Sequence, residues 1–192
     1  MKICHNDTET TGLNDQVNEV IQITMIIEED GKFIDAIDLK LKPDHPERFS
    51  EEALEKTGLT LEEVATWPER DVQFKKLITF LDKHVDKFDK EDKLYMCGYH
   101  NLFDQKFLRA YFEEQGHKYF GSYFWFEVID VMVVAMLLRI MGAIQVENLK
   151  LRTVAAAVGV DFDEEQAHNA IYDVKKTIAT FYKMEKMLEL KE

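Results

Sequence analysis

Two carboxylates interrupt the first apolar stretch of the chain. The sequence C-H-N-D-T-E-T-T-G-L, residues 4–13, follows the apolar Ile3 and places Asp7 and Glu9 two positions apart. Alternate side chains of a strand share a face, so both carboxylates point the same way. Paired oxygen ligands of this kind suit a hard divalent cation such as Mg²⁺. An isolated D-x-E pair is more often a solvated strand end, so the pair needs support from elsewhere in the chain.

Two later stretches carry the remaining candidates. G-Y-H-N-L-F-D-Q-K-F-L, residues 98–108, places Asp104 in the first turn of a predicted helix, where an acidic residue also complements the helix dipole. A-H-N-A-I-Y-D-V-K-K-T, residues 167–177, places His168 and Asp173 at the start of the last predicted helix. Taken separately, each of these residues is explained as well by an ordinary surface or capping role.

The three stretches together are distinctive. In the order D-x-E-T-T-G, H-N-x-F-D and A-H-x-x-x-x-D, they resemble the motifs of the DEDD 3′–5′ exonucleases, the proofreading-subunit (DnaQ-like) type within the ribonuclease-H-like superfamily. The resemblance spans nearly the whole chain and includes connecting segments such as N-L-K-L at 148–151. It implies that the metal-binding carboxylates are Asp7, Glu9, Asp104 and Asp173. It also implies that His168 is the general base of the histidine branch (DEDDh), because the tyrosine branch would need a tyrosine where Asn169 stands.

The chemistry of such a site is consistent with these residue types. Four converging carboxylates would repel one another, and some of their pKa values would be raised unless cations neutralise them. Two divalent ions, Mg²⁺ or Mn²⁺, would neutralise them while one activates water and the other stabilises the leaving oxygen. A histidine with a pKa near neutrality can accept the proton of that water. On one continuous helix His168 and Asp173 would lie about 140° apart, so we expect His168 in the loop that enters the helix.

The resemblance implies a metal-dependent 3′–5′ exonuclease that releases nucleoside 5′-monophosphates from the 3′ ends of single-stranded DNA. The resemblance implies that the residues flanking the terminal nucleotide are Thr10, Leu13, Asn101 and Phe103. An exoribonuclease or oligoribonuclease using the same site stays open, because contacts to the 2′-OH cannot be read from the sequence. A catalytically silent nucleic-acid-binding module is the rival of a different class, and the complete set of four acids and a histidine argues against it. Action on small nucleotides is a third option.

The elements that must position these residues predict a single α/β domain over residues 1–192. Strands are expected over 2–7, 17–29 and 32–42 as three antiparallel neighbours, with a turn at Asp30-Gly31. Strands near 94–100 and 125–130 then alternate with helices, which indicates a mixed sheet. The resemblance implies that this sheet is ribonuclease-H-like, with three antiparallel strands plus parallel strands, flanked by helices. The expected helices are 50–58 with Ser50 as N-cap, 59–65, 70–86, one bearing Phe107 to Phe112, one ending near Met141, 147–158 and 168–188.

The charge of the chain restricts the kind of nucleic-acid contact that it can make. Its 37 acidic and 24 basic residues leave a formal net charge of −13. Broad binding to phosphates is driven by Lys and Arg, so an extended basic surface is excluded and any nucleic-acid site must be local. Metal ions would supply positive charge at such a site. The two cysteines, Cys4 and Cys97, are expected as reduced core residues without a zinc or redox role.

Location and partners are predicted from the ends and the apolar segments of the chain. The first residues lack the basic start and apolar run of a signal peptide. The apolar stretch 128–138 carries Asp130 and is too short to span a bilayer. We therefore expect a cytoplasmic protein without membrane contact. The chain ends at residue 192 without a polymerase-binding tail, which favours a stand-alone nuclease and leaves a polymerase or homodimer partner open.

Two further stretches need a structural explanation. The aromatic run 119–126 is expected mainly as core around a strand, with base stacking or a dimer face as the alternative. His5 and Asn6 stand where the family pattern has apolar residues, and the sequence does not explain either of them.

Overall fold

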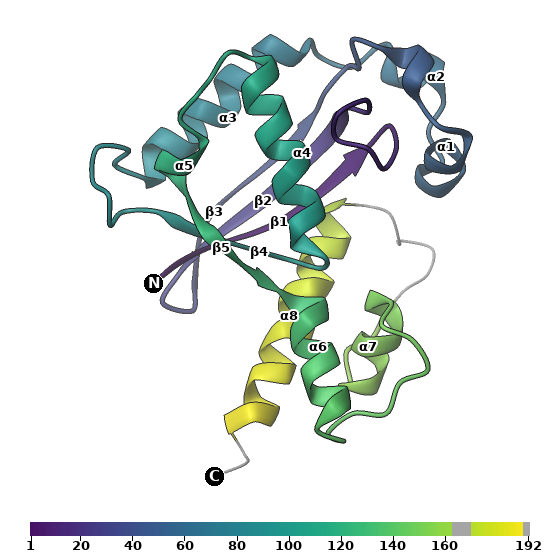
Figure 1. The fold of residues 1–192 in the computed structure, drawn as a ribbon, viewed down its shortest axis with the longest axis vertical. Coiled ribbons are helices and arrows are strands. Elements are labelled where there is room, and N and C mark those ends of the chain that lie inside the picture. The colour runs from purple at the N-terminus through teal and green to yellow at the C-terminus, as the bar shows by residue number, and fades with distance from the viewer. Residues whose placement is uncertain (163–169, 190–192) are drawn as a thin grey trace.

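The computed structural model describes residues 1–162 and 170–189, and its centre is a five-stranded sheet (Figure 1). The strands lie in the order β3-β2-β1-β4-β5. Their bounds are β1 Lys2–Thr10, β2 Val20–Glu29, β3 Lys32–Lys40, β4 Leu94–Gly98 and β5 Phe124–Asp130. β2 pairs antiparallel with β1 and with β3, whereas β4 runs parallel to β1 and β5. The predicted mixed sheet is therefore confirmed.

Local sequence determines the first hairpin turn, whereas pairing with β2 determines where β1 ends. Asp30 and Gly31 both adopt positive φ, 49° and 77°, which is the geometry of the tight hairpin turns that an Asp-Gly pair favours. The prediction that the first strand ends near residue 7 is wrong. β1 continues to Thr10, because its antiparallel pairing with β2 extends through Glu9 before the register shifts. Asp7 and Glu9 therefore lie within the strand.

The helices follow the predicted pattern with shifted ends. Those in the described ranges are η1 Pro46–Arg48, α1 Glu51–Thr57, α2 Leu61–Val64, α3 Arg70–His84, α4 Asn101–Glu114, α5 Phe120–Tyr123, α6 Val131–Ile140, α7 Leu151–Ala157 and α8 Ala170–Glu189. Ser50 caps α1, since its hydroxyl accepts a hydrogen bond from the Ala53 N–H at 3.1 Å. The expectation of a helix from 147 is wrong, because Asn148 Oδ1 accepts from the Lys150 N–H and forms a turn before α7. None of the described helices is both long and apolar enough to cross a membrane.

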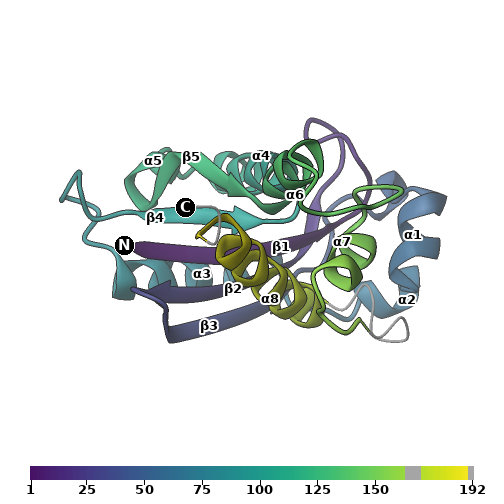
Figure 2. The same ribbon diagram turned by 90° about the horizontal axis from the view of Figure 1, so that it is seen from below.

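Alternation along β1 places its side chains in two layers. Cys4 belongs to the larger core, which α3 and α4 close on one face of the sheet. Ile3 belongs to a smaller core with residues of α6, α7 and α8. α8 packs across β1 and β2 on this second face (Figure 2). Cys4 and Cys97 are buried, unpaired and on opposite faces, which confirms their assignment to the core.

The aromatic run 119–126 divides between core and surface. Its buried members are Phe120, Tyr123 and Phe124, all of which belong to the larger core. Tyr119 and Phe126 are 67% and 81% exposed. The core assignment is thus confirmed for the first group, while base stacking or a dimer contact by the exposed rings stays a prediction.

Candidate active site

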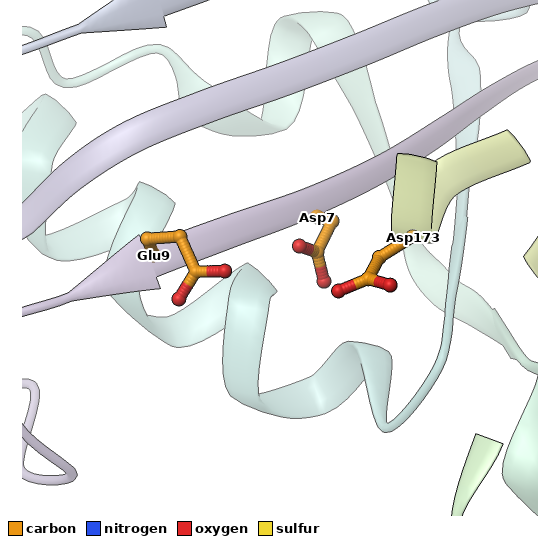
Figure 3. Close-up of side chains that lie close together, drawn as sticks. All are labelled: Asp7, Glu9 and Asp173. Carbon is orange, nitrogen blue, oxygen red and sulfur yellow. The ribbon is translucent and has the colours of Figure 1, made fainter. Parts of the chain in front are cut away.

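Three carboxylates from distant parts of the sequence meet near the carboxyl end of β1 (Figure 3). Asp7 and Glu9 project from the same side of this strand, and Asp173 reaches them from the first turn of α8. One oxygen of each side chain lies within 4.8 Å of the other two, so the structure brings these predicted residues together. His168, the predicted general base, lies outside the described residues.

The fourth predicted carboxylate, Asp104, comes from the other side of the sheet. It is 3% exposed in the first turn of α4. Its Oδ1 accepts the backbone N–H of Thr8 at 2.9 Å and the Thr8 hydroxyl at 2.7 Å. Thr8 stands between Asp7 and Glu9 and points to the opposite face of β1, so Asp104 is attached to the same strand segment without joining the cluster of three.

Burial and like charges shift the protonation of these groups. Burial, followed by the charges of Asp104, Glu9 and Asp173, raises the pKa of Asp7 well above its ordinary value. Burial raises the pKa of Glu9 to about 7, and the charge of Lys56 partly opposes that shift. Burial also raises the pKa of Asp104 to about 7, although the hydrogen bonds from Thr8 favour its charged form. Without a cation, the four groups therefore do not all stay ionised at neutral pH.

The carboxylate cluster lines a cleft of about 670 Å³. Cationic and aromatic side chains of the described residues also line it, namely Lys56, Tyr99, Lys150, Arg152 and Phe162. Sequence reasoning missed them, because single basic and aromatic residues scattered over a hundred positions carry no spacing signal. The N-L-K-L segment, which contains Lys150, is the signal that could have pointed to one of them.

The predicted substrate-contacting residues differ in their access to solvent. Leu13 is 76% exposed, and Phe103 is half-buried beside the larger core. Thr10 is buried, with its hydroxyl donating to the Gly12 carbonyl at 2.6 Å. Asn101 is fully buried and donates from Nδ2 to Asn6 Oδ1 at 3.1 Å. Leu13 and Phe103 are thus the two with side-chain surface available to a ligand.

The hydrogen bond from Asn101 of α4 explains why the polar Asn6 stands in the middle of β1. The amide pair joins the middle of β1 to the first residue of α4, the helix that carries Asp104. It also accounts for Gly98 at the end of β4, where a Cβ atom would lie 2.2 Å from Asn101 Nδ2 and 2.7 Å from the Asn6 carbonyl. The polar residue in the strand therefore positions α4 against the sheet.

His5 is explained by a buried polar group on the other face. Its ring is fully buried, with Nε2 3.4 Å from Glu28 Oε2 on β2. The hydroxyl of Tyr182, from α8, donates to the other oxygen of Glu28. Burial lowers the pKa of His5, against the opposing charge of Glu28, so the imidazole is neutral at pH 7. These three side chains link β1, β2 and α8, the helix that carries Asp173.

Comparison with known sequences identifies the family. The model of the family RNase_T, described as exonuclease, matches residues 6–181. A DNA polymerase III PolC-type protein of Bacillus cereus is 28% identical over 183 residues, and one of Thermotoga petrophila is 24% identical over 183 residues. Each match covers 95% of this chain but only 11% and 12%, respectively, of the relatives. The chain therefore spans a small part of their length.

Solved structures share the architecture. E. coli exonuclease I in complex with a dT13 oligonucleotide matches with a TM-score of 0.77 and 20% identity, covering 96% of this chain and 41% of that one. Exonuclease I of Methylocaldum szegediense matches with a TM-score of 0.79 and 20% identity, covering 99% and 41%. At such identities the likeness establishes the fold alone. Together with the family match over most of its length, it shows that this chain belongs to the RNase_T exonuclease family and is a DEDD-type domain with the ribonuclease-H-like fold.

Proposed function

We propose that residues 1–192 form one metal-dependent 3′–5′ exonuclease domain that hydrolyses single-stranded DNA from its 3′ end. The observation that carries the proposal is the meeting of Asp7, Glu9 and Asp173 oxygens within 4.8 Å in a cleft. The PolC-type relatives are DNA polymerases by name, and one exonuclease I neighbour was solved with a dT13 oligonucleotide. Both support DNA as the substrate, and the PolC names support a polymerase as partner.

The donor set fits divalent cations. All donors are carboxylate oxygens, which Mg²⁺ and Mn²⁺ prefer. Burial, and to a smaller extent neighbouring carboxylates, raises the pKa values of Asp7, Glu9 and Asp104, so a bound cation would favour their ionised forms. We propose that Asp7, Glu9, Asp104 and Asp173 hold two such ions. When bound, these ions would supply the positive charge that lowers the pKa of water and stabilises the leaving oxygen.

The remaining roles fall to side chains of this chain. His168 is proposed as the general base, which accepts a proton from water as the water oxygen bonds to phosphorus. The 3′-oxygen of the preceding nucleotide then leaves, and the product is a nucleoside 5′-monophosphate. Leu13 and Phe103 are proposed to contact the terminal nucleotide directly. Thr10 and Asn101, which are buried, are proposed to shape its pocket through the backbone they hold.

A digestion of matched DNA and RNA oligomers tests the proposal. Each carries a 5′ label and a free 3′ end, and each is incubated with Mg²⁺ or Mn²⁺. We expect the DNA to shorten stepwise from its 3′ end, with nucleoside 5′-monophosphates as the products. Predominant cleavage of the RNA would replace DNA as the substrate, and absence of degradation of either polymer would overturn the enzyme assignment.

A further inference from the structure

Two lysines that line the cleft have no anionic partner among the residues that the structure describes. They are Lys56, in the last turn of α1, and Lys150, the residue before α7. Acids outnumber bases in this chain, and lysines elsewhere hold carboxylates, as Lys75 holds Asp71 at 2.9 Å and Lys83 holds Asp35 at 2.6 Å. Within residues 1–162 and 170–189, the amino groups of Lys56 and Lys150 make no hydrogen bond or ion pair. Among the described residues, no carboxylate pairs with the amino group of either lysine.

The two lysines reach the cleft from separate parts of the fold. Figure 1 shows α1 and α7 apart from each other, flanking the region where β1 ends and α8 begins. Lys56 lines the same cleft as Asp7 and Glu9. Lys56 thus lies near the carboxylates, yet it forms no ion pair with them within the described chain.

The segment that carries Lys150 is held in place by the end of β4. The hydroxyl of Tyr99, one residue after β4, donates to the Leu149 carbonyl at 2.6 Å. Arg152 follows on the first turn of α7 and lines the same cleft. Lys150 and Arg152 are both exposed residues on this fixed segment of backbone.

The side chains that line the cleft are of the kinds that bind a single strand of nucleic acid. Grooves that bind single-stranded nucleic acid combine cations that follow the backbone with aromatic rings, and Tyr99 and Phe162 line this cleft beside its cations. A lysine that only balanced the carboxylates would be expected to pair with one of them. A lysine that has no carboxylate partner among the described residues can meet a phosphate of the substrate without first breaking an ion pair with one of them.

We propose that Lys56 and Lys150 reach into the cleft from two of its walls and clamp the phosphates of a single strand that lie on the 5′ side of the phosphodiester held at the carboxylate cluster. The inference rests on the proposed function, because a strand whose last phosphodiester lies at the carboxylates must lead its next phosphates along the cleft. A clamp of this kind also determines which substrates are preferred. Oligomers with several phosphates bind more tightly than dinucleotides, which offer the clamp a single phosphodiester.

Binding measured as a function of salt tests the clamp. The probe is a 5′-fluorescent oligothymidylate, followed by anisotropy in Ca²⁺ with wild type, K56Q, K150Q and K76Q. Lys76 is an exposed lysine of α3 that also makes no ion pair within the described residues. We expect K56Q and K150Q each to weaken binding by about threefold to tenfold and to reduce the slope of log K against log[salt] by about 0.7. K76Q should change neither.

Two outcomes separate this inference from the proposed function. If the wild type digests the oligomer in Mg²⁺ while K56Q and K150Q bind it as K76Q does, the clamp is refuted and the nuclease stands. If K56Q and K150Q lose affinity and salt dependence while the wild type digests no nucleic acid, the clamp stands and the nuclease is refuted. Urea unfolding of each variant shows that the exposed substitutions leave the fold intact.

Discussion

Thr8 donates its backbone N–H and its hydroxyl to the same oxygen of Asp104, at 2.9 and 2.7 Å. The two residues lie 96 positions apart in sequence, Thr8 in β1 and Asp104 in α4. Since Thr8 is flanked by Asp7 and Glu9, this contact fixes the fourth carboxylate relative to the other three. Substitutions at Thr8 can therefore separate the positioning of Asp104 from its charge.

Thr8→Val keeps the shape of the side chain but removes the hydroxyl donor. Because it leaves a buried carboxylate oxygen short of one partner, we expect the free energy of unfolding to fall by about 1–3 kcal/mol. We also expect slower turnover, because Asp104 is less firmly held. Urea unfolding and the digestion assay measure the two effects. Thr8→Ser retains the hydroxyl and should restore both, and a valine variant as stable and active as wild type would show that the contact is dispensable.

Asp7→Asn removes one of several like charges while keeping the side-chain size. We expect at least a roughly hundredfold loss of turnover in Mg²⁺ or Mn²⁺, because the ions lose a carboxylate that faces two others. The metal-free protein should become more stable at neutral pH, because burial, followed by the neighbouring carboxylates, disfavours in the folded state the ionised form that Asp7 adopts in the unfolded chain. Thermal unfolding with a chelator measures the second effect. Glu113→Gln, an exposed carboxylate of α4 with no ion pair within the described residues, is the control for loss of charge alone.

The stability of the metal-free protein should fall as pH rises through the acidic range. The pKa of Glu9 is raised from 4.5 to about 7 and that of Asp104 from 3.8 to about 7. The folded state therefore binds these protons more tightly than the unfolded state, so their contribution is present below the unfolded values and is lost as pH approaches 7. Asp35 is shifted in the opposite direction, with its pKa lowered to about 2, so its contribution to stability changes at lower pH than those of Glu9 and Asp104.

Thermal unfolding at several pH values checks this sign. We expect a lower Tm at about pH 8 than at about pH 5 with a chelator present, and a larger rise in Tm on adding Mg²⁺ at the higher pH. Glu9→Gln should flatten the dependence. The comparison with Glu9→Gln cancels the contribution of His5, whose lowered pKa acts in the opposite direction in this range. A Tm difference between the two pH values that is as large in Glu9→Gln as in wild type would contradict the pKa shift assigned to Glu9.

Tyr182→Phe tests the buried link among β1, β2 and α8. The change removes the hydroxyl that donates to Glu28, a residue that is 7% exposed, so we expect a loss of about 1–3 kcal/mol in the free energy of unfolding. The metal concentration needed for half-maximal activity should also rise, because α8 carries Asp173. Tyr119→Phe removes the hydroxyl of an exposed tyrosine and should change neither quantity.

The order of the motifs and the alternation along β1 could be read from the sequence, because residue types and a period of two are local properties. They were enough to predict the mixed sheet, the family and a shared orientation for Asp7 and Glu9. The end of β1 was misjudged, because strand length depends on the pairing of Glu9 with Gln22 on β2, which is a long-range contact.

Only the tertiary structure decided how each polar residue of β1 is used. His5 and Asn6 looked like flaws in an apolar strand, but they face Glu28 on one side and Asn101 on the other. Likewise, the sequence does not show that Lys56 and Lys150 line the cleft, because only the folded chain brings α1 and the start of α7 beside the carboxylates. A sequence specifies which side chains are available and which face of an element they occupy. Which distant side chains meet them depends on the packing of whole elements.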